Sequence, residues 1–218
     1  MNHPESADSP TLPVVETFHS LQGEGLHAGR SAVFIRLGGC SVGCSWCDTK
    51  HSWPAAVHPQ RPLSALAHEV QQAAEAGAAF VVITGGEPLE HNLTPLCQAL
   101  ASTETPLPLH LETSGVGPWS GQFQWVSLSP KPHRPPATAA LRHCDELKVV
   151  VHSASDLAFA ETMAAATRAQ RSAGATGPAL LLQPGWDCAS GQTLAIDFVR
   201  QHPEWRLSLQ THKWLGVR

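Results

Sequence analysis

Short apolar runs alternate along the chain with longer segments in which apolar residues recur about once per helical turn. The runs are rich in Val, Ile, Leu and Phe, which is typical of buried strands. They predict strands at residues 14–18, 33–37, 80–84, 109–112, 125–128, 147–151, 179–183 and 206–210. The helical spacing predicts helices at 61–76, from 92 or 94 to 100, at 155–171 and at 190–201.

Alternating strands and helices indicate βα units and parallel strands, and therefore the α/β fold class. A complete eight-fold βα barrel needs about 250 residues, whereas this chain has 218. We therefore expect a compact, incomplete TIM-like βα barrel that forms a single domain over residues 14–218. Residues 1–13 are polar and contain three prolines, so we expect a disordered N-terminal tail there.

Composition narrows the classes of function. The net charge is −4 and 15% of the residues are charged, without the clustered basic face that nucleic-acid binding requires. No apolar run approaches the roughly 18 residues that a membrane helix needs, and the N-terminus lacks the pattern of a secretory signal. We therefore expect a cytoplasmic protein that binds neither membranes nor nucleic acid.

Three of the six cysteines, Cys40, Cys44 and Cys47, lie within eight residues of one another. Clustered thiols in a cytosolic chain indicate metal binding. A structural zinc site prefers four ligands, and His51 is the nearest fourth candidate, so a non-catalytic metal-binding domain stays open as an alternative. A [4Fe-4S] cluster held by three thiolates would instead leave one iron open to a small molecule. The scattered Cys97, Cys144 and Cys188 are expected to be small buried hydrophobic residues.

The string Cys40-x3-Cys44-x-Trp46-Cys47 resembles the signature of the radical S-adenosylmethionine (SAM) superfamily. The resemblance implies that the three cysteines hold a [4Fe-4S] cluster whose open iron binds SAM. No side chain is then catalytic, because SAM itself gives the 5′-deoxyadenosyl radical. The TGGEP string at 84–88 resembles the superfamily motif that binds the SAM ammonium group. The SAM contacts implied are Trp46, Cys47, Asp48, Gly86, Ser129, Pro130, Lys131, Gln183, Pro184, Gly185 and Trp186.

A narrower resemblance rests on FHSLQGEG at 18–25, CDTKHSW at 47–53, LETSG at 111–115, SPK at 129–131 and LQTHKW at 209–214. Together these strings resemble the 7-carboxy-7-deazaguanine synthase family, carbon–nitrogen lyases of queuosine and 7-deazapurine biosynthesis. The resemblance implies that 6-carboxy-5,6,7,8-tetrahydropterin loses its C6 hydrogen, contracts its ring and releases ammonia. SAM is re-formed and Mg²⁺ assists. It also implies a homodimer and a flavodoxin- or ferredoxin-type reductant.

The same resemblance assigns residues around the substrate. Arg36 would hold the substrate carboxylate through a fork of two hydrogen bonds, and Thr49 would be the Mg²⁺ ligand. Glu112 could accept hydrogen bonds from the guanidine-like edge of the pterin, and His212 is a further pocket candidate. The implied substrate contacts are Leu21, Gln22, Gly23, Arg36, Thr84 and Arg218.

One other enzyme class fits the cysteines and the compact size. A radical SAM activase of a glycyl-radical enzyme shares both features, but it would lack the QGEG string and the CDT string found here. The sequence leaves open whether the product serves tRNA modification or a secondary metabolite.

Overall fold

A computed structural model describes residues 10–172 and 174–217. Nine strands form a single sheet in the order β3-β1-β2-β4-β5-β6-β7-β8-β9. The outer strands β3 and β9 pair with one neighbour each, so the sheet is open and the expected incomplete barrel is confirmed. The strands are β1 (Thr11–Leu21), β2 (Ser31–Leu37), β3 (Gln60–Pro62), β4 (Val81–Gly85), β5 (Leu109–Thr113), β6 (Trp125–Leu128), β7 (Glu146–Val151), β8 (Ala179–Pro184) and β9 (Trp205–Leu207).

One edge of the sheet departs from the expected parallel arrangement. Neighbouring strands from β2 to β9 are parallel, but β1 runs antiparallel to β2 and β3 runs antiparallel to β1. Residues 22–30 alone join β1 to β2. That connection is too short for the crossover of a dozen or more residues that parallel pairing requires.

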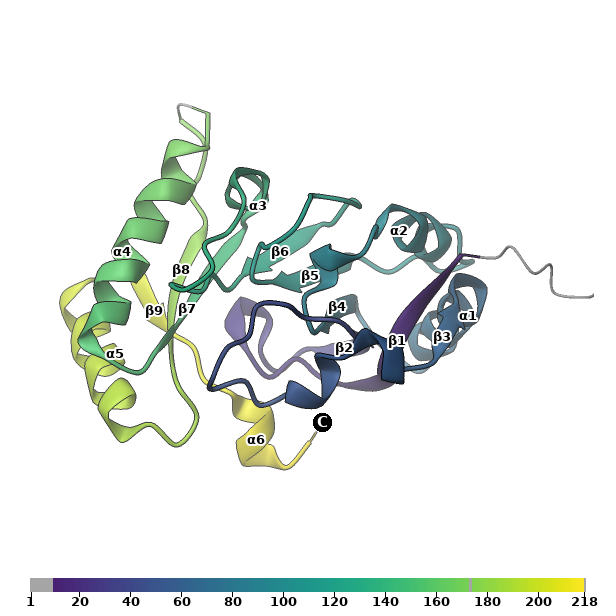
Figure 1. Cartoon of the computed structure of the whole chain (residues 1–218), viewed down its shortest axis with the longest axis horizontal. Coiled ribbons are helices and arrows are strands. Elements are labelled where there is room, and N and C mark those ends of the chain that lie inside the picture. The colour runs from purple at the N-terminus through teal and green to yellow at the C-terminus, as the bar shows by residue number, and fades with distance from the viewer. Residues whose placement is uncertain (1–9, 173, 218) are drawn as a thin grey trace, which may run out of the picture.

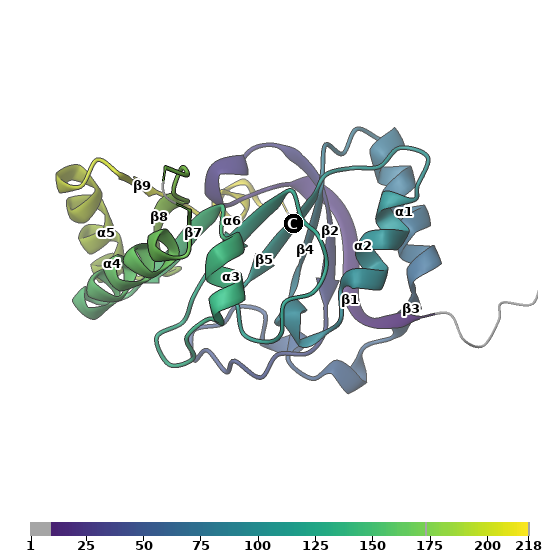
Figure 2. The same cartoon turned by 90° about the horizontal axis from the view of Figure 1, so that it is seen from above.

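Helices line the outer side of the curved sheet, and the shortest one lies elsewhere. The α helices are α1 (Leu63–Glu75), α2 (Thr94–Ala101), α3 (Thr138–His143), α4 (Ala154–Ala169), α5 (Ala189–Gln201) and α6 (Thr211–Leu215). In Figures 1 and 2, α1 to α5 follow the outside of the sheet, whereas α6 lies beneath it beside the loop that follows β2. The sequence patterns did not predict β3, α3 or α6, each of which has six residues or fewer.

The main core lies between the sheet and the helices. Ile35, Ile83 and Leu111 on three adjacent strands are fully buried there. Since side chains alternate between the faces of a strand, the next residues, Arg36, Thr84 and Glu112, point to the inner face. Register places Arg36 opposite Thr84, and Glu112 opposite Ser127 of β6. The inner face therefore carries a row of polar side chains.

The predicted tail boundary at residue 13 is wrong in its last residues. Residues 1–9 lie outside the described part of the chain, but β1 begins at Thr11, and residues 11–13 pair with β3. Leu12 packs into the core with 7% of its surface exposed, because an apolar side chain gains stability from burial. Among the described residues, no helix has the length and apolar character needed to cross a membrane.

Candidate active site

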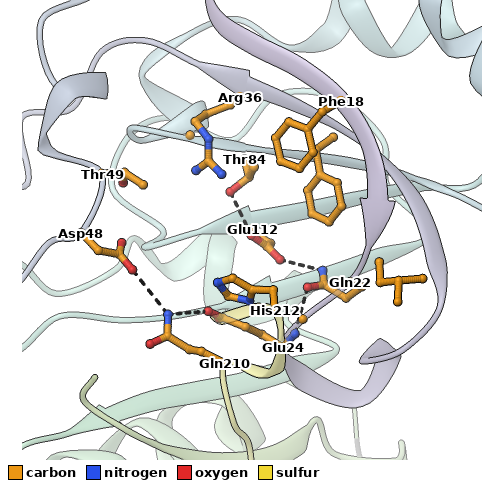
Figure 3. A pocket seen from close by; sticks show the side chains of 14 residues that line it. Phe18, Gln22, Glu24, Arg36, Asp48, Thr49, Thr84, Glu112, Gln210 and His212 are labelled. Carbon is orange, nitrogen blue, oxygen red and sulfur yellow. Dashed lines mark hydrogen bonds between the residues drawn. The ribbon is translucent and has the colours of Figure 1, made fainter. Parts of the chain in front are cut away.

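A cavity of about 200 Å³ opens where β2, β4 and β5 end on the inner face. We call it the β2–β5 cavity. The carboxyl ends of parallel strands are where α/β folds usually place their active sites. Figure 3 shows the polar side chains that converge there. Its walls are Phe18, Leu21, Gln22, Gly23, Glu24, Phe34, Arg36, Asp48, Thr49, Thr84, Gly85, Glu112, Gln210 and His212.

Glu112 is fixed from both sides at the floor of this cavity. Gln22 Nε2 donates to its Oε1 at 2.8 Å, and Thr84 Oγ1 donates to its Oε2 at 2.9 Å. The Oε1 of Gln22 in turn accepts from the backbone N–H of Glu24 at 3.0 Å. The chain Glu24–Gln22–Glu112–Thr84 therefore sets the orientation of an amide and a carboxylate without any ligand.

A cation and an aromatic wall face this floor. Arg36 Nε donates to Glu16 Oε1 at 3.0 Å, and the rest of its guanidinium points into the cavity (Figure 3). Phe18 and Phe34 stack with ring centroids 4.8 Å apart and an interplanar angle of 7°. A flat apolar wall beside a carboxylate, an amide and a guanidinium suits a planar, polar-edged ring that carries a negative group.

The segment around α6 closes the cavity from the opposite side. The backbone N–H and the hydroxyl of Thr211 donate to Gly23 O at 2.9 and 3.0 Å. His212 packs against Gly23 so closely that a Cβ there would lie 2.1 Å from its Nδ1. Lys213 Nζ donates to Asp48 Oδ2 at 2.6 Å. Gly23 is therefore required where the β1–β2 connection meets this segment.

A second cavity of about 320 Å³, which we call the cysteine cavity, adjoins the first. Glu24, Asp48 and Gln210 line both cavities and form their common wall. The remaining walls of the cysteine cavity are Cys44, Trp46, Cys47, Ser129, Lys131, Lys148, Val150, His152, Gln183, Pro184, Gly185 and Trp186.

Glycines seat the cysteine loop against the strand ends. Gly39 has φ of 107°, a conformation that favours glycine. A Cβ on Gly86 would lie 2.1 Å from Gly39 O and 3.0 Å from Cys40 Cβ. The loop after β4 therefore touches the backbone of the cysteine loop directly, and a side chain at Gly86 would push the two apart.

The donor set fits an iron–sulfur cluster. Cys40, Cys44 and Cys47 are free thiols, and thiolates are the ligands of such clusters. No group of three or more His, Cys, Asp or Glu side chains in the described residues is placed to hold a single metal ion. Thiols spread along one loop match a multi-iron cluster, in which each cysteine takes a different iron.

Among the scattered cysteines, Cys97 and Cys144 are buried as expected. Cys188 is half-buried instead. Its sulfur accepts from the N–H of Gly191 at 3.4 Å, so it caps the N-terminus of α5.

Glu87 of the TGGEP string has a structural position. It is 1% exposed and accepts from the N–H groups of Leu89 and Ser114 at 3.0 and 2.8 Å, as well as from two hydroxyls, those of Thr113 and Ser114. Burial raises the pKa of Glu87, and these hydrogen bonds oppose that rise. The side chain thereby ties the loop after β4 to the end of β5.

Two lysines line the cysteine cavity, and Lys148 is buried whereas Lys131 is half-buried. Lys148 of β7 forms an ion pair with Glu24, and Lys131 Nζ donates to Ser129 Oγ at 2.7 Å. Burial alone would raise the pKa of Glu24, but the charge of Lys148 together with hydrogen bonds from Lys148, Gln210 and Gln183 outweighs it, and the pKa is lowered. Burial also lowers the pKa of Lys131. The wall between the two cavities thus contains this salt bridge, and its Glu24 carboxylate also accepts a hydrogen bond from Gln210 Nε2 at 2.9 Å.

The structure brings together most residues that the sequence singled out. In the β2–β5 cavity these are Leu21, Gln22, Gly23, Arg36, Thr49, Thr84, Glu112 and His212. Trp46, Cys47, Asp48, Ser129, Lys131 and the 183–186 segment line the cysteine cavity. Cys40, Gly86 and Pro130 are not among the walls of that cavity. Arg218 lies outside the described residues.

Sequence reasoning missed several walls. Glu24 and Gln210 lie within the strings at 18–25 and 209–214, which carry the family resemblance, but no role was assigned to either residue. Their membership of these strings could have identified them as wall residues. Lys148 lies in an apolar strand, and its position beside Glu24 follows only from the folded sheet. Phe18 and Phe34 pair across β1 and β2, a contact that requires the antiparallel edge.

Comparisons with known proteins agree with this geometry. Residues 21–156 match the family model described as a 4Fe-4S single cluster domain. The 7-carboxy-7-deazaguanine synthase of Prochlorococcus marinus is 52% identical, over 96% of this chain and 99% of that protein. The Synechocystis enzyme of the same name is 48% identical, over 95% of this chain and 94% of that protein.

A solved structure is also similar. The crystal structure of QueE from Escherichia coli is 31% identical in sequence, with a TM-score of 0.77. The match covers 93% of this chain and 95% of that one. Sequence, fold and cysteine loop agree, so the chain belongs to the 7-carboxy-7-deazaguanine synthase family of radical SAM enzymes.

Proposed function

We propose that this protein converts 6-carboxy-5,6,7,8-tetrahydropterin to 7-carboxy-7-deazaguanine, with loss of ammonia, in queuosine or 7-deazapurine biosynthesis. The observation that carries the proposal is the shared wall between a cavity lined by cysteines and a cavity lined by ring-binding polar groups. A radical formed in the cysteine cavity would therefore be next to a ring held in the β2–β5 cavity.

The β2–β5 cavity supplies the complementary groups that a carboxylated pterin needs. Glu112 offers acceptor oxygens, and Gln22 offers an amide, so the two can pair with the amino and amide groups along one ring edge. Arg36 is at the other side of the cavity and holds the carboxylate. Leu21, Gly23 and Thr84 complete the substrate contacts that we propose.

Cys44 and Cys47, which line the cysteine cavity, and Cys40 on the same loop would hold the cluster. When bound there, the cluster and SAM supply the radical that removes the C6 hydrogen. Lys131, half-buried in the wall of the cysteine cavity, would offer a positive charge to the carboxylate of SAM. We propose that the other SAM contacts come from Trp46, Cys47, Asp48, Gly86, Ser129, Pro130, Gln183, Pro184, Gly185 and Trp186.

The segment around α6 keeps water away from the reacting ring. Thr211 is fixed to Gly23, and Lys213 reaches Asp48 across the common wall. A radical intermediate needs such exclusion, because water-filled sites permit side reactions.

Thr49 is the proposed Mg²⁺ ligand. It lines the β2–β5 cavity, and its hydroxyl lies 3.5 Å from Cys47 Sγ. A hydroxyl is a hard oxygen donor, and Mg²⁺ usually keeps waters and substrate oxygens as its other ligands. Replacing Thr49 with Ala should abolish most of the stimulation of turnover by Mg²⁺ while the iron content stays unchanged, and Thr49→Ser should retain it. Equal stimulation in Thr49→Ala and the parent would refute this role.

Further parts of the proposal concern partners and location. We propose a flavodoxin- or ferredoxin-type reductant, a homodimer and a cytoplasmic location, and Arg218, which lies outside the described residues, remains a proposed substrate contact. Sedimentation of the reconstituted protein tests the dimer, and removal of Arg218 tests its part in substrate affinity.

Anaerobic turnover tests the function itself. The reconstituted protein with SAM, a reductant, Mg²⁺ and the carboxylated tetrahydropterin should yield 7-carboxy-7-deazaguanine, detected by mass spectrometry. Because SAM is re-formed, free 5′-deoxyadenosine should be far less abundant than product. A protein that carries the cluster and cleaves SAM but leaves the pterin unchanged would contradict the proposed substrate.

A further inference from the structure

A small chamber adjoins the β2–β5 cavity at Glu112. Its volume is about 10 Å³, which corresponds to about one water molecule. Gln22, Glu24 and Glu112 line both the chamber and the β2–β5 cavity. The chamber walls are Gln22, Glu24, His27, His110, Leu111, Glu112, Trp125, Ser127 and Glu146.

The tautomer of His27 is fixed by its neighbour. Arg30 Nη1 lies 2.7 Å from His27 Nδ1, and a guanidinium has donors but no acceptor. Nδ1 is therefore the acceptor, and in the neutral ring the proton is on Nε2. Burial lowers the pKa of His27, and the charge of Arg30 lowers it further, so the neutral ring is the form present near pH 7.

His27 Nε2–H is thus a buried donor. It has no hydrogen-bond partner among the protein groups of the described residues. Leaving such a donor unpaired in the folded protein is unfavourable. The ring is held by its contacts with Trp125 and His110, whose centroids each lie 4.6 Å away, so it cannot swing toward solvent without losing them.

Acceptors are available on the opposite walls. Glu146 accepts from Ser127 Oγ at 2.8 Å and from the N–H of Leu26 at 2.7 Å. Glu112 accepts from Gln22 and Thr84. Each carboxylate oxygen has two lone pairs and one of them is used by these bonds, so both groups retain acceptor capacity.

These walls select the occupant. An anion would face the carboxylates of Glu24, Glu112 and Glu146, and a cation would leave the N–H of His27 without an acceptor. A neutral molecule that accepts one hydrogen bond and donates two satisfies every group, and a volume of about 10 Å³ admits nothing larger than water.

We propose that one ordered water molecule occupies this chamber, accepts from His27 Nε2–H and donates to Glu112 and Glu146. His27 is thereby a positioning residue for Glu112, the carboxylate that faces the ring in the β2–β5 cavity. The water site stands on the chamber alone, whereas its effect on turnover rests on the proposed function.

Three variants distinguish the effect of losing the His27 donor in the chamber from the effect of a general loss of stability. His27→Phe keeps an aromatic ring but removes the donor, and His27→Gln keeps an N–H that can reach the water. His68→Phe is the matched control, because His68 lies on α1 at the outer side of the sheet. Thermal unfolding of each variant shows whether the fold is intact before any other comparison is made.

The first readouts need no turnover. A high-resolution crystal structure of the reconstituted protein should show one water within hydrogen-bond distance of His27 Nε2. Nitrogen NMR of labelled histidine should show His27 protonated at Nε2. An undisturbed chamber without a water, or a proton on Nδ1, would overturn the water site.

The second readout is the KM of the carboxylated tetrahydropterin. His27→Phe should raise KM about ten-fold with a smaller change in kcat, whereas His27→Gln and His68→Phe should stay within about two-fold of the parent. This follows because losing one buried hydrogen bond costs about 1–1.5 kcal/mol, or about ten-fold in a binding constant. An unchanged KM in folded His27→Phe would overturn the positioning role. Absence of turnover in the parent protein would instead count against the proposed function.

Discussion

The β2–β5 cavity and the cysteine cavity share a wall, yet their polar groups are held differently. In the first, side chains fix one another: Gln22 and Thr84 both donate to Glu112. In the second, the cysteine loop is placed by backbone contacts such as that between Gly86 and Gly39 O. The β2–β5 cavity is therefore preorganised by its own side chains, whereas the cysteine cavity leaves its thiols free for a group that the chain does not supply.

This difference indicates how each cavity should respond to substitution. Substitutions of cofactor ligands in the cysteine cavity should prevent the cofactor from binding and so abolish turnover. Changes in the β2–β5 cavity should alter affinity by amounts set by single hydrogen bonds. Substitutions in the common wall should instead lower the stability of the fold, because its salt bridge is largely buried and supports both cavities.

The largest effect is expected at Cys47. Cys47→Ser should lower the iron and sulfide content and abolish product formation, because a hydroxyl replaces a thiolate ligand. Iron and sulfide analysis of the anaerobically purified protein measures this. Cys188→Ser is the control, since serine also caps helices, and it should keep iron and turnover. Full iron content in Cys47→Ser would contradict its assignment as a ligand.

The next effect concerns the stability of the common wall. Glu24→Gln or Lys148→Met alone leaves one buried charge unpaired, which should lower the free energy of unfolding by about 3–5 kcal/mol. The double variant should recover most of that loss. Urea denaturation of all four proteins gives the coupling between the two side chains. Additive losses in the double variant would show that the pair is not coupled.

The same pair predicts how stability depends on pH. The pKa of Glu24 is lower in the folded protein than its ordinary value of 4.5, so the unfolded state binds a proton more readily. Its contribution is complete above about pH 4.5 and is lost as the pH falls through the lower folded pKa. Glu24→Gln should therefore flatten the decrease in unfolding free energy on the acid side. An unchanged acid limb would place the titration on another group.

A smaller effect is expected at Arg36. Arg36→Met should lower kcat/KM by about 100-fold, and Arg36→Lys by about ten-fold, because hydrogen bonds to charged groups contribute about 1.5–3 kcal/mol. Lysine keeps the charge but loses the planar fork. Steady-state kinetics with the carboxylated pterin measures both, and Arg61→Lys, whose side chain pairs with Glu69 elsewhere, is the control. Equal losses in both Arg36 variants would show that charge alone does not explain the role.

The smallest effect is expected at Lys213. Its pair with Asp48 is partly exposed, with 53% of the Asp48 side chain accessible. Such pairs contribute at most about 1 kcal/mol, so Lys213→Met should change substrate KM by less than about five-fold. Glu204→Gln is the control, because Glu204 is exposed and is not among the walls of either cavity. A loss of turnover in Lys213→Met comparable to that of Cys47→Ser would mean that the lysine has a direct part in the chemistry.

The sequence was most informative where structure or function depends on residues that are close together in the chain. The apolar runs predicted β6 at its observed bounds and most other strands within a few residues, because buried parallel strands are nearly continuous apolar segments. The cysteine trio and the strings beside it named most of the walls of both cavities. β3 and α6 were missed because short elements carry too few periods to be recognised. Lys148 was missed because its partner, Glu24, is 124 residues away.

The contact between Gly23 and Thr211 has a consequence for synthesis of the protein. The two residues are 188 positions apart, and the ribosome releases the chain from its N-terminus. The cysteine loop and the strands around it thus emerge well before the segment that covers them. The site of a nascent chain is therefore uncovered throughout most of translation, and its thiols are accessible to oxidation by oxygen during that interval.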